Sequence, residues 1–245
     1  MFTENVKRPG VTRRRGRPQG RTEQGAVTHE LLYRNALELI AERGYEAATL
    51  RDLAKRTDLS PALLYKYFPS KRAILLQLYD ELSAEFAQRA EAIPNGRWRD
   101  RFLFSLTTSL EVLRPQRKTL AALIPVLLGD SGDGLFASST SFSRVRVQNV
   151  FHNAVVGAVD APRSDTSDAL AHLLYLLHLA VILWWLLDKS PQQRATAALI
   201  ALFKRALPAF ATALRFKKLR SLVLAGDSLV RDALFDTAED GRQTT

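Results

Sequence analysis

The chain has 245 residues, a formal net charge of +10 and 47% hydrophobic residues. This length is enough for two domains with a sizeable core. The absence of cysteine excludes a disulfide-stapled fold and thiol chemistry, and it is compatible with a cytoplasmic location. The charge is uneven, because residues 1–25 carry a net +5 and residues 26–75 a net +2. A basic end of this kind is typical of a surface that faces nucleic-acid phosphates.

Residues 1–25 form a polar arm rich in Arg, Gly and Pro. Low hydrophobicity predicts that this arm is disordered when free, and it lacks the apolar run of a secretory signal. Its segment Arg15-Gly16-Arg17-Pro18 resembles the core of an AT-hook, which lays arginines in a narrow minor groove. Two interpretations stay open: Arg15 and Arg17 insert in the minor groove, or the arm adds non-specific affinity through counterion release. Both assign the arm to DNA.

Residues 28–43 are predicted to form the first helix. Leu32, Ala36 and Ile40 recur at helical spacing and mark one apolar face. Gly44 follows directly and supplies the residue that commonly ends a helix. This helix can enclose a small core with the two that come next.

Residues 49–71 predict a helix, a tight turn, a second helix and the start of a third. Thr49 can cap the first helix, with Asp52 three residues later. Asp58 lies in the turn, where an aspartate tolerates left-handed backbone better than most residues. Ser60 can cap the second helix. These signals together predict a helix-turn-helix.

The second helix of this motif separates an inner face from an outer one. Pro61 takes its first position, where the missing N–H is harmless. Leu64 and Phe68 share the inner face, whereas Tyr65 and Lys66 point outward. A helix-turn-helix places its second helix in the major groove of DNA. The residues expected to contact DNA are Thr49, Arg51, Ser60, Pro61, Ala62, Leu63, Tyr65, Lys66, Tyr67 and Lys71, with Arg15 and Arg17 from the arm.

This segment resembles the N-terminal domain of the TetR family of bacterial transcription regulators. The resemblance implies an all-α, TetR-like homodimer with a three-helix DNA-binding domain and a larger helical domain for effector binding and dimerisation. The chain departs from the family pattern at Asp58, where glycine is common, and at residues 61–63, which offer few hydrogen-bond donors. Base reading is therefore expected to depend on thymine methyl contacts and on Arg51, Tyr65 and Lys66. The matching residues are 44–45, 48–54, 59–60 and 64–71.

The rest of the chain is predicted to be a succession of helices. Ser190, Pro191 and Gln193 give a strong start signal for one of the last of them. The expected helices cover 70–92, 97–113, 116–128, 135–159, 166–187, 191–214 and 217–235. The expected divisions are a basic arm 1–25, a helix-turn-helix domain 26–75, an effector-binding and dimerisation domain 76–235, and a flexible tail 236–245.

Residues 169–187 contain no charged side chain. The length of this uncharged segment lies at the lower limit for a membrane span. A helix that is apolar all round can equally be buried in a core or a subunit interface. The family resemblance implies that the last two long helices build a four-helix dimer interface, and we favour this over a membrane span. The residues expected in the interface are Leu176, Leu179, Leu183 and Leu187.

An effector pocket in this domain is expected to be mostly apolar with a few polar groups. Arg144 and Arg146 are two residues apart and cannot share a helix face, so at most one points inward, where it would favour an acidic effector. The expected effector is therefore small and apolar or acidic. The candidate ligand-binding residues, each also compatible with ordinary core packing, are Phe142, Phe151, His152, Tyr175, His178 and Trp184.

Enzyme function is not expected. The four histidines have no metal-ligand spacing, and no glycine-rich phosphate loop follows a strand, so neither a metal nor a cofactor is expected. The sequence is interpreted as that of a cytoplasmic, ligand-responsive repressor without a membrane anchor, which binds a pseudo-palindromic site on double-stranded DNA as a homodimer. One alternative is an activator or a ligand-independent regulator on the same fold. A second is a helical enzyme or a membrane-anchored protein.

Overall fold

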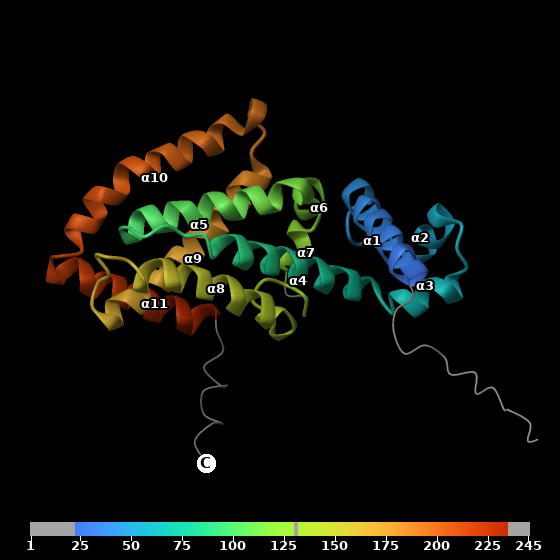
Figure 1. The fold of residues 1–245 in the computed structure, drawn as a ribbon, viewed down its shortest axis with the longest axis horizontal. Helices are drawn as coiled ribbons and strands as arrows, with labels where there is room; N and C mark the ends of the chain where they lie inside the picture. Colours follow the sequence, from blue (N-terminus) through green and yellow to red (C-terminus); the bar gives the residue numbers. More distant parts are fainter. Residues whose placement is uncertain (1–22, 130–131, 235–245) are drawn as a thin grey trace, which may run out of the picture.

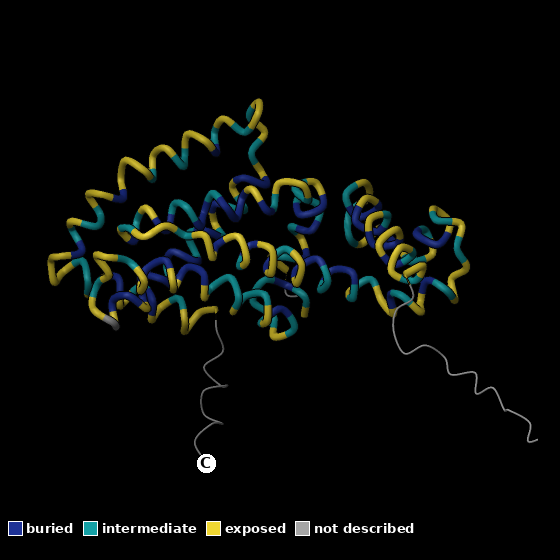
Figure 2. The backbone as a smooth tube through the Cα atoms, viewed as in Figure 1, coloured by how far each residue is buried: buried dark blue, intermediate teal, exposed yellow. Residues whose placement is uncertain are grey.

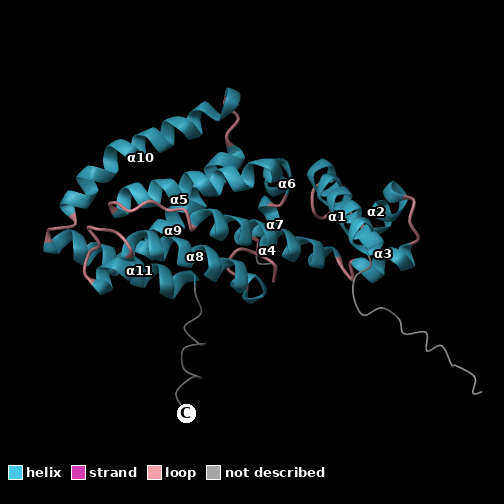
Figure 3. Cartoon of the chain, viewed as in Figure 1, coloured by secondary structure: helices cyan, strands magenta, loops and turns pink. Residues whose placement is uncertain are grey.

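The computed structural model describes residues 23–129 and 132–234, and every regular element in this part of the chain is a helix (Figures 1 and 3). The all-α prediction is therefore confirmed. The basic arm before residue 23, with Arg15 and Arg17, lies outside the described residues, as does the tail 236–245.

The first three helices form a small unit at one end of the molecule (Figure 1). They are α1 (Glu23–Arg43), α2 (Leu50–Thr57) and α3 (Pro61–Tyr67), and α1 begins earlier than the expected residue 28. Gly44, with φ 82°, ends α1 in the left-handed region that favours glycine. The side chains fully buried in this unit include Leu32, Ile40, Leu53, Leu64 and Phe68.

The larger domain is joined to this unit by one continuous helix, α4 (Lys71–Ala90). The expected domain boundary between residues 75 and 76 thus falls inside a helix. A second connection comes from α6, which packs against α1, where the Thr119 hydroxyl donates to the Leu37 carbonyl over 3.5 Å. The small unit is therefore held at two places.

The core of the larger domain is made by α4, α5, α8 and α9, and α11 packs along α9. Its large buried side chains include Trp98, Phe102, Phe151 and Trp185. The helices are α5 (Trp98–Leu113), α6 (Arg117–Ala122), α7 (Ile124–Leu128), α8 (Ser141–Val156), α9 (Ser164–Leu187), α10 (Arg194–Ala213) and α11 (Lys217–Leu234), with 3₁₀ turns at Arg114–Gln116, Ser138–Thr140 and Pro191–Gln193.

Two expected helices are divided in the structure. Residues 116–128 form a 3₁₀ turn and two short helices, because Pro125 starts a new helix rather than continuing the old one. Residues 135–159 begin as a loop, and only α8 is α-helical. The carbonyls of Leu135 and Ala137 accept hydrogen bonds from the Arg144 guanidinium, both over 3.1 Å, and the Ala137 carbonyl also accepts from the Thr140 N–H in a 3₁₀ turn.

The start of α10 was also predicted wrongly. Gln192 and Gln193 have φ values of 53° and 58°, so neither can lie in the first turn of a helix. The Gln193 side chain instead accepts a hydrogen bond from the Trp185 indole over 2.8 Å. The Ser190 hydroxyl accepts from the Ala195 backbone N–H over 2.9 Å, beyond the reach of an ordinary cap. A tertiary contact has therefore replaced the expected capping box.

The helix α10 arches over the outside of the domain and exposes most of its length (Figures 1 and 2). Thr196 and Leu207 are its only buried residues. The segments Asp165–Leu187 and Pro191–Ala213 both have the length and apolar composition of a membrane span, and 44% and 11% of their apolar windows are buried. The first is thus largely a core helix, whereas the second leaves an apolar face uncovered.

Candidate nucleic-acid interface and interior cavity

The turn between α2 and α3 has the geometry of a helix-turn-helix. The Thr49 hydroxyl accepts from the Asp52 backbone N–H over 3.1 Å and caps α2. Asp58 ends α2 in the left-handed region, with φ 52° and ψ 34°, as expected for an aspartate in place of glycine. The Ser60 hydroxyl accepts from the Leu63 backbone N–H over 3.2 Å and caps α3, which begins with Pro61.

The outer face of α3 is open to solvent. Leu64 and Phe68 are buried below it, whereas Tyr65 is 55% exposed. Lys66 is exposed beside Tyr65, and Tyr67 is half-buried against the His29 ring. An exposed aromatic ring and a lysine on a short, doubly capped helix form a rigid reading surface. The other expected contacts that are exposed are Thr49, Arg51, Ser60, Pro61 and Ala62, and Leu63 is half-buried.

The basic side chains around this surface divide into paired and unpaired groups. Arg56 donates to Glu42 over 2.8 and 2.9 Å and reaches Glu38 at 3.3 Å, so it fastens α2 to α1. Arg51 and Lys66 are exposed and make no ion pair within 4.0 Å among the described residues. These two are therefore available to neutralise phosphates.

Lys71 has a different environment from the one expected. Its ammonium group donates to the Tyr45 carbonyl and, over 3.4 Å, to the Glu46 carbonyl, and it lies 4.1 Å from the centre of the Tyr45 ring. Lys71 thus joins the first turn of α4 to the loop before α2. Its removal would disturb the position of the reading unit as well as any phosphate contact.

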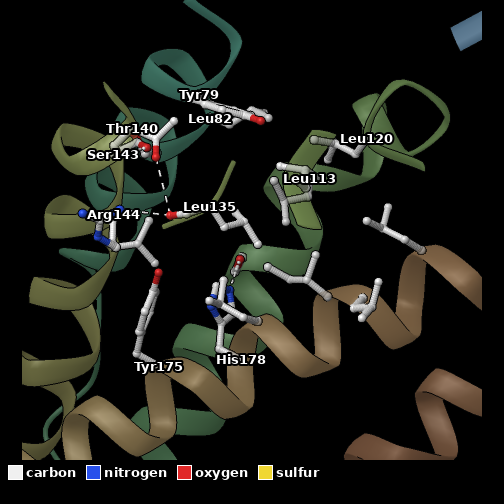
Figure 4. A pocket seen from close by; sticks show the side chains of 18 of the residues that line it. Tyr79, Leu82, Leu113, Leu120, Leu135, Thr140, Ser143, Arg144, Tyr175 and His178 are labelled. Atoms are coloured by element: carbon white, nitrogen blue, oxygen red, sulfur yellow. Dashed lines mark hydrogen bonds between the residues drawn. The ribbon is translucent and has the colours of Figure 1, made fainter. Parts of the chain in front are cut away.

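The larger domain contains a partly open cavity of about 310 Å³ between α4, α5, α6, α7, α8 and α9 (Figure 4). This volume lies at the lower end of the range for small-molecule sites, which is roughly 300–1,000 Å³. Most of the lining is aliphatic. The lining residues with polar atoms are Tyr79, Ser83, Ser109, Thr140, Ser143, Arg144, Tyr175 and His178.

His178 is among the most deeply buried polar side chains of the cavity. Its Nε2 lies 2.7 Å from the Ser109 hydroxyl oxygen, which joins α9 to α5. Burial lowers the pKa of His178 to about 3, so the imidazole is neutral near pH 7. Burial also raises the pKa of the Tyr175 phenol, which lies one turn earlier on α9 and faces the same space (Figure 4). Along α9 the cavity therefore presents neutral polar groups.

The two arginines of α8 point in different directions, as their spacing requires. Arg144 lines the cavity, and its guanidinium donates to the carbonyls of the loop that precedes α8. Arg146 turns toward α4, where it donates to the Asp80 carboxylate over 2.8 Å and to the Ser83 hydroxyl over 2.7 Å. Arg144 is thus the cation nearest to the cavity, and it already bonds to backbone oxygens.

The candidate ligand-binding residues divide between cavity, core and surface. Tyr175 and His178 line the cavity. Phe151 is buried behind the His178 ring, with 4.6 Å between the ring centroids. The candidates that lie on the surface are Phe142, His152 and Trp184. Sequence reasoning missed Ser109, although a serine on the apolar side of α5 is itself a signal for a polar group in a core.

The residues expected in a dimer interface are also divided. Leu179 and Leu183 line the cavity, Leu176 packs against the core, and only Leu187 is well exposed. An all-apolar helix gives no periodicity from which its outer face can be read, so the predicted stripe was rotated toward the interior. The well-exposed large apolar side chains of these two helices are Trp184 and Leu187 of α9 and Leu202 of α10.

Comparison with known proteins assigns a family to the helix-turn-helix end of the chain. The family model "Bacterial regulatory proteins, tetR family" matches residues 32–78, which is the helix-turn-helix unit and the start of α4. The regulator EthR of Mycolicibacterium smegmatis is 32% identical over 98 residues, and the fatty acid metabolism regulator of Bacillus subtilis is 36% identical over 56 residues. These matches cover 38% and 23% of this chain, but only 43% and 29% of the relatives' own lengths.

The solved structures extend the likeness to the rest of the fold. The regulator FadR from Bacillus subtilis, in complex with stearoyl-CoA, superposes with a TM-score of 0.59 at 15% identity and covers 71% of this chain and 97% of its own. A regulator from Streptomyces coelicolor gives a TM-score of 0.55 at 19% identity and covers 83% of this chain and 89% of its own. The expected resemblance is confirmed: residues 32–78 match the TetR family of bacterial regulatory proteins, and the fold as a whole is that of solved regulators of this kind.

Proposed function

We propose that this protein is a homodimeric transcriptional repressor that releases its operator DNA when a small molecule enters the cavity. The observation that carries the proposal is the exposed face of α3, where Tyr65 and Lys66 stand outward above buried Leu64 and Phe68. Each protomer would place α3 in one major groove of a pseudo-palindromic site. Arg51 would contact the backbone from α2.

The uncovered apolar face of α9 and α10 supports the homodimer. Trp184 and Leu202 are 49% and 57% exposed on neighbouring helices, and the α10 segment is only 11% buried. An apolar surface of this kind marks an interaction site. A two-fold axis would bury it against its own copy and set the distance between two reading units. A membrane anchor is the competing explanation, and it predicts a requirement for detergent.

The route from the cavity to the reading unit runs through α4. Tyr79 on α4 lines the cavity, and α4 continues without a break to Lys71, which holds the loop before α2. Arg72, in the first turn of α4, pairs with Asp133, two residues before Leu135, which also lines the cavity. A ligand that binds better to one position of α4 than to another would shift the separation of the two reading units.

An effector with an apolar chain fits the lining better than a polar one. The solved FadR complex from Bacillus subtilis holds stearoyl-CoA, which supports an apolar effector on this fold. In this proposal the protein acts by binding DNA and an effector, and it has no catalytic role. An activator, or a regulator that needs no ligand, would share the fold and the DNA interface.

Selection of bound sequences from random double-stranded DNA tests the proposal directly. We expect a pseudo-palindrome with half-sites about one helical turn apart, bound by a detergent-free dimer with a steep salt dependence. Enrichment of no sequence above background would refute DNA reading. A single enriched half-site bound by a monomer would refute the dimer and retain the reading helix.

A further inference from the structure

The polar centre of the cavity has one unused hydrogen-bonding position. His178 lines the cavity and is 2% exposed, and its Nδ1 is covered by neighbouring side chains and has no hydrogen-bond partner among the described residues. Leaving a buried polar nitrogen unpaired is unfavourable by roughly 1–3 kcal/mol, so such groups call for an explanation. Phe86 and Phe151 pack against the ring and cannot supply a partner.

The hydrogen-bond pattern assigns the tautomer of His178. The Ser109 hydroxyl makes no other hydrogen bond among the residues that the structure describes. Its proton is therefore satisfied by donation to Nε2 of His178, over the observed 2.7 Å. The ring proton of the neutral imidazole then lies on Nδ1, which becomes an unpaired donor.

The remaining lining is unsuited to a charged head group. Leu113, Leu120 and Ile182 are among the aliphatic side chains that surround the space. Arg144 donates through one guanidinium nitrogen to two backbone carbonyls over 3.1 Å, which fixes its head group at the loop before α8. A carboxylate placed against the neutral imidazole of His178 would lose its hydration without gaining a cation from that residue.

We infer that the cavity binds an apolar, uncharged molecule with one carbonyl-type acceptor, which receives a hydrogen bond from Nδ1 of His178. The inference rests on the proposed effector role of the cavity and names the chemistry of that effector. Its apolar part would fill the space between α4 and α9, and its carbonyl oxygen would reach Nδ1 of His178 when the side chains that cover this atom shift, while Ser109 holds the other ring nitrogen. Such a ligand satisfies the buried nitrogen and needs no counter-ion.

The test compares two probes of similar length, 2-nonanone and octanoate, by isothermal titration calorimetry on the full-length protein at pH 7. We expect the ketone to bind at least tenfold more tightly than the carboxylate. His178→Phe retains the ring shape and removes the donor, and it should weaken ketone binding about tenfold. The matched control His152→Gln changes an exposed histidine outside the cavity and should leave ketone affinity unchanged.

A spectroscopic measurement makes the result independent of how the variant folds. Nitrogen-15 spectra of the histidine-labelled wild-type protein should show His178 with its proton on Nδ1. Ketone carrying carbon-13 at the carbonyl should show the downfield shift of a hydrogen-bonded carbonyl on binding. A proton on Nε2, a preference for octanoate, undiminished ketone binding by His178→Phe, or no binding of either probe would overturn the inference.

These outcomes are separable from failure of the proposed function. Ketone binding that depends on His178 without any effect on operator affinity would support the ligand class and refute the coupling to DNA. Specific operator binding by a protein that binds no ketone would retain the DNA-binding role and overturn the ligand class.

Discussion

The buried imidazole of His178 should make the stability of the protein fall as the pH is lowered from 7 to 5. In the unfolded chain this histidine titrates near its ordinary pKa of about 6.5, whereas burial lowers its folded pKa to about 3. The unfolded state therefore binds a proton in this range and the folded state does not. Stability is full above the unfolded pKa and is lost as the pH falls through it.

The size of the effect follows from the two pKa values. At pH 7 the unfolded histidine is mostly neutral, and the penalty is about 0.2 kcal/mol. At pH 5 it is almost fully protonated, and the penalty is about 2 kcal/mol. His178→Phe removes this titration. When the pH is lowered from 7 to 5, the unfolding free energy of the variant should therefore rise by about 2 kcal/mol relative to that of the wild type.

Urea unfolding of both proteins at pH 7, 6 and 5, followed by circular dichroism, measures this change. The comparison cancels every other titrating group that the two proteins share. Phe151→Leu, which truncates a ring against the same histidine, provides a control whose offset from wild type should be constant with pH. A constant offset for His178→Phe as well would refute the claim that the folded protein holds a neutral, buried imidazole at this position.

Three further predictions concern the interfaces. Lys66→Ala should weaken operator binding and lower the slope of log affinity against log salt by about one unit, whereas Lys204→Ala on α10 should not; equal salt slopes in fluorescence anisotropy would remove Lys66 from the interface. Leu202→Asp should place an unpaired charge in the dimer contact, at a cost of several kcal/mol, and give a monomer in analytical ultracentrifugation with weak operator binding; a normal dimer would move the interface elsewhere. Arg72→Ala breaks a half-exposed ion pair worth no more than about 1 kcal/mol, so the fold should persist while effector-induced release of DNA is reduced, and an unchanged effector response in a gel-shift titration would exclude this route.

The helix-turn-helix was predictable because its signals are local. Thr49, Ser60 and Pro61 act on backbone groups within three residues of themselves, and the structure has them at the expected helix starts. Asp58 takes the left-handed conformation that its side chain tolerates. Short-range capping depends little on the rest of the molecule, so sequence alone determines it.

The cavity could not be predicted because its contacts are distant in sequence. Ser109 and His178 are 69 residues apart, and their hydrogen bond depends on how α5 and α9 pack. The bond of Gln193 to Trp185 spans only eight residues, but it crosses the turn between α9 and α10, so local capping signals did not reveal it. Because α9 has no polar face, the sequence does not indicate which side of this helix points outward. Leu183 was therefore expected in the interface, whereas it lines the cavity.

The loose attachment of α10 has a consequence for local stability. Because only Thr196 and Leu207 of this helix are buried, few apolar contacts oppose its opening in a single protomer. Its backbone amides should exchange with solvent faster than those of α9, and the exchange should slow as the protein concentration rises and copies cover the helix. The protection of the α10 amides from exchange then measures assembly directly. In a newly synthesised monomer α10 is accessible to cellular proteases, whereas in the assembled protein it is covered.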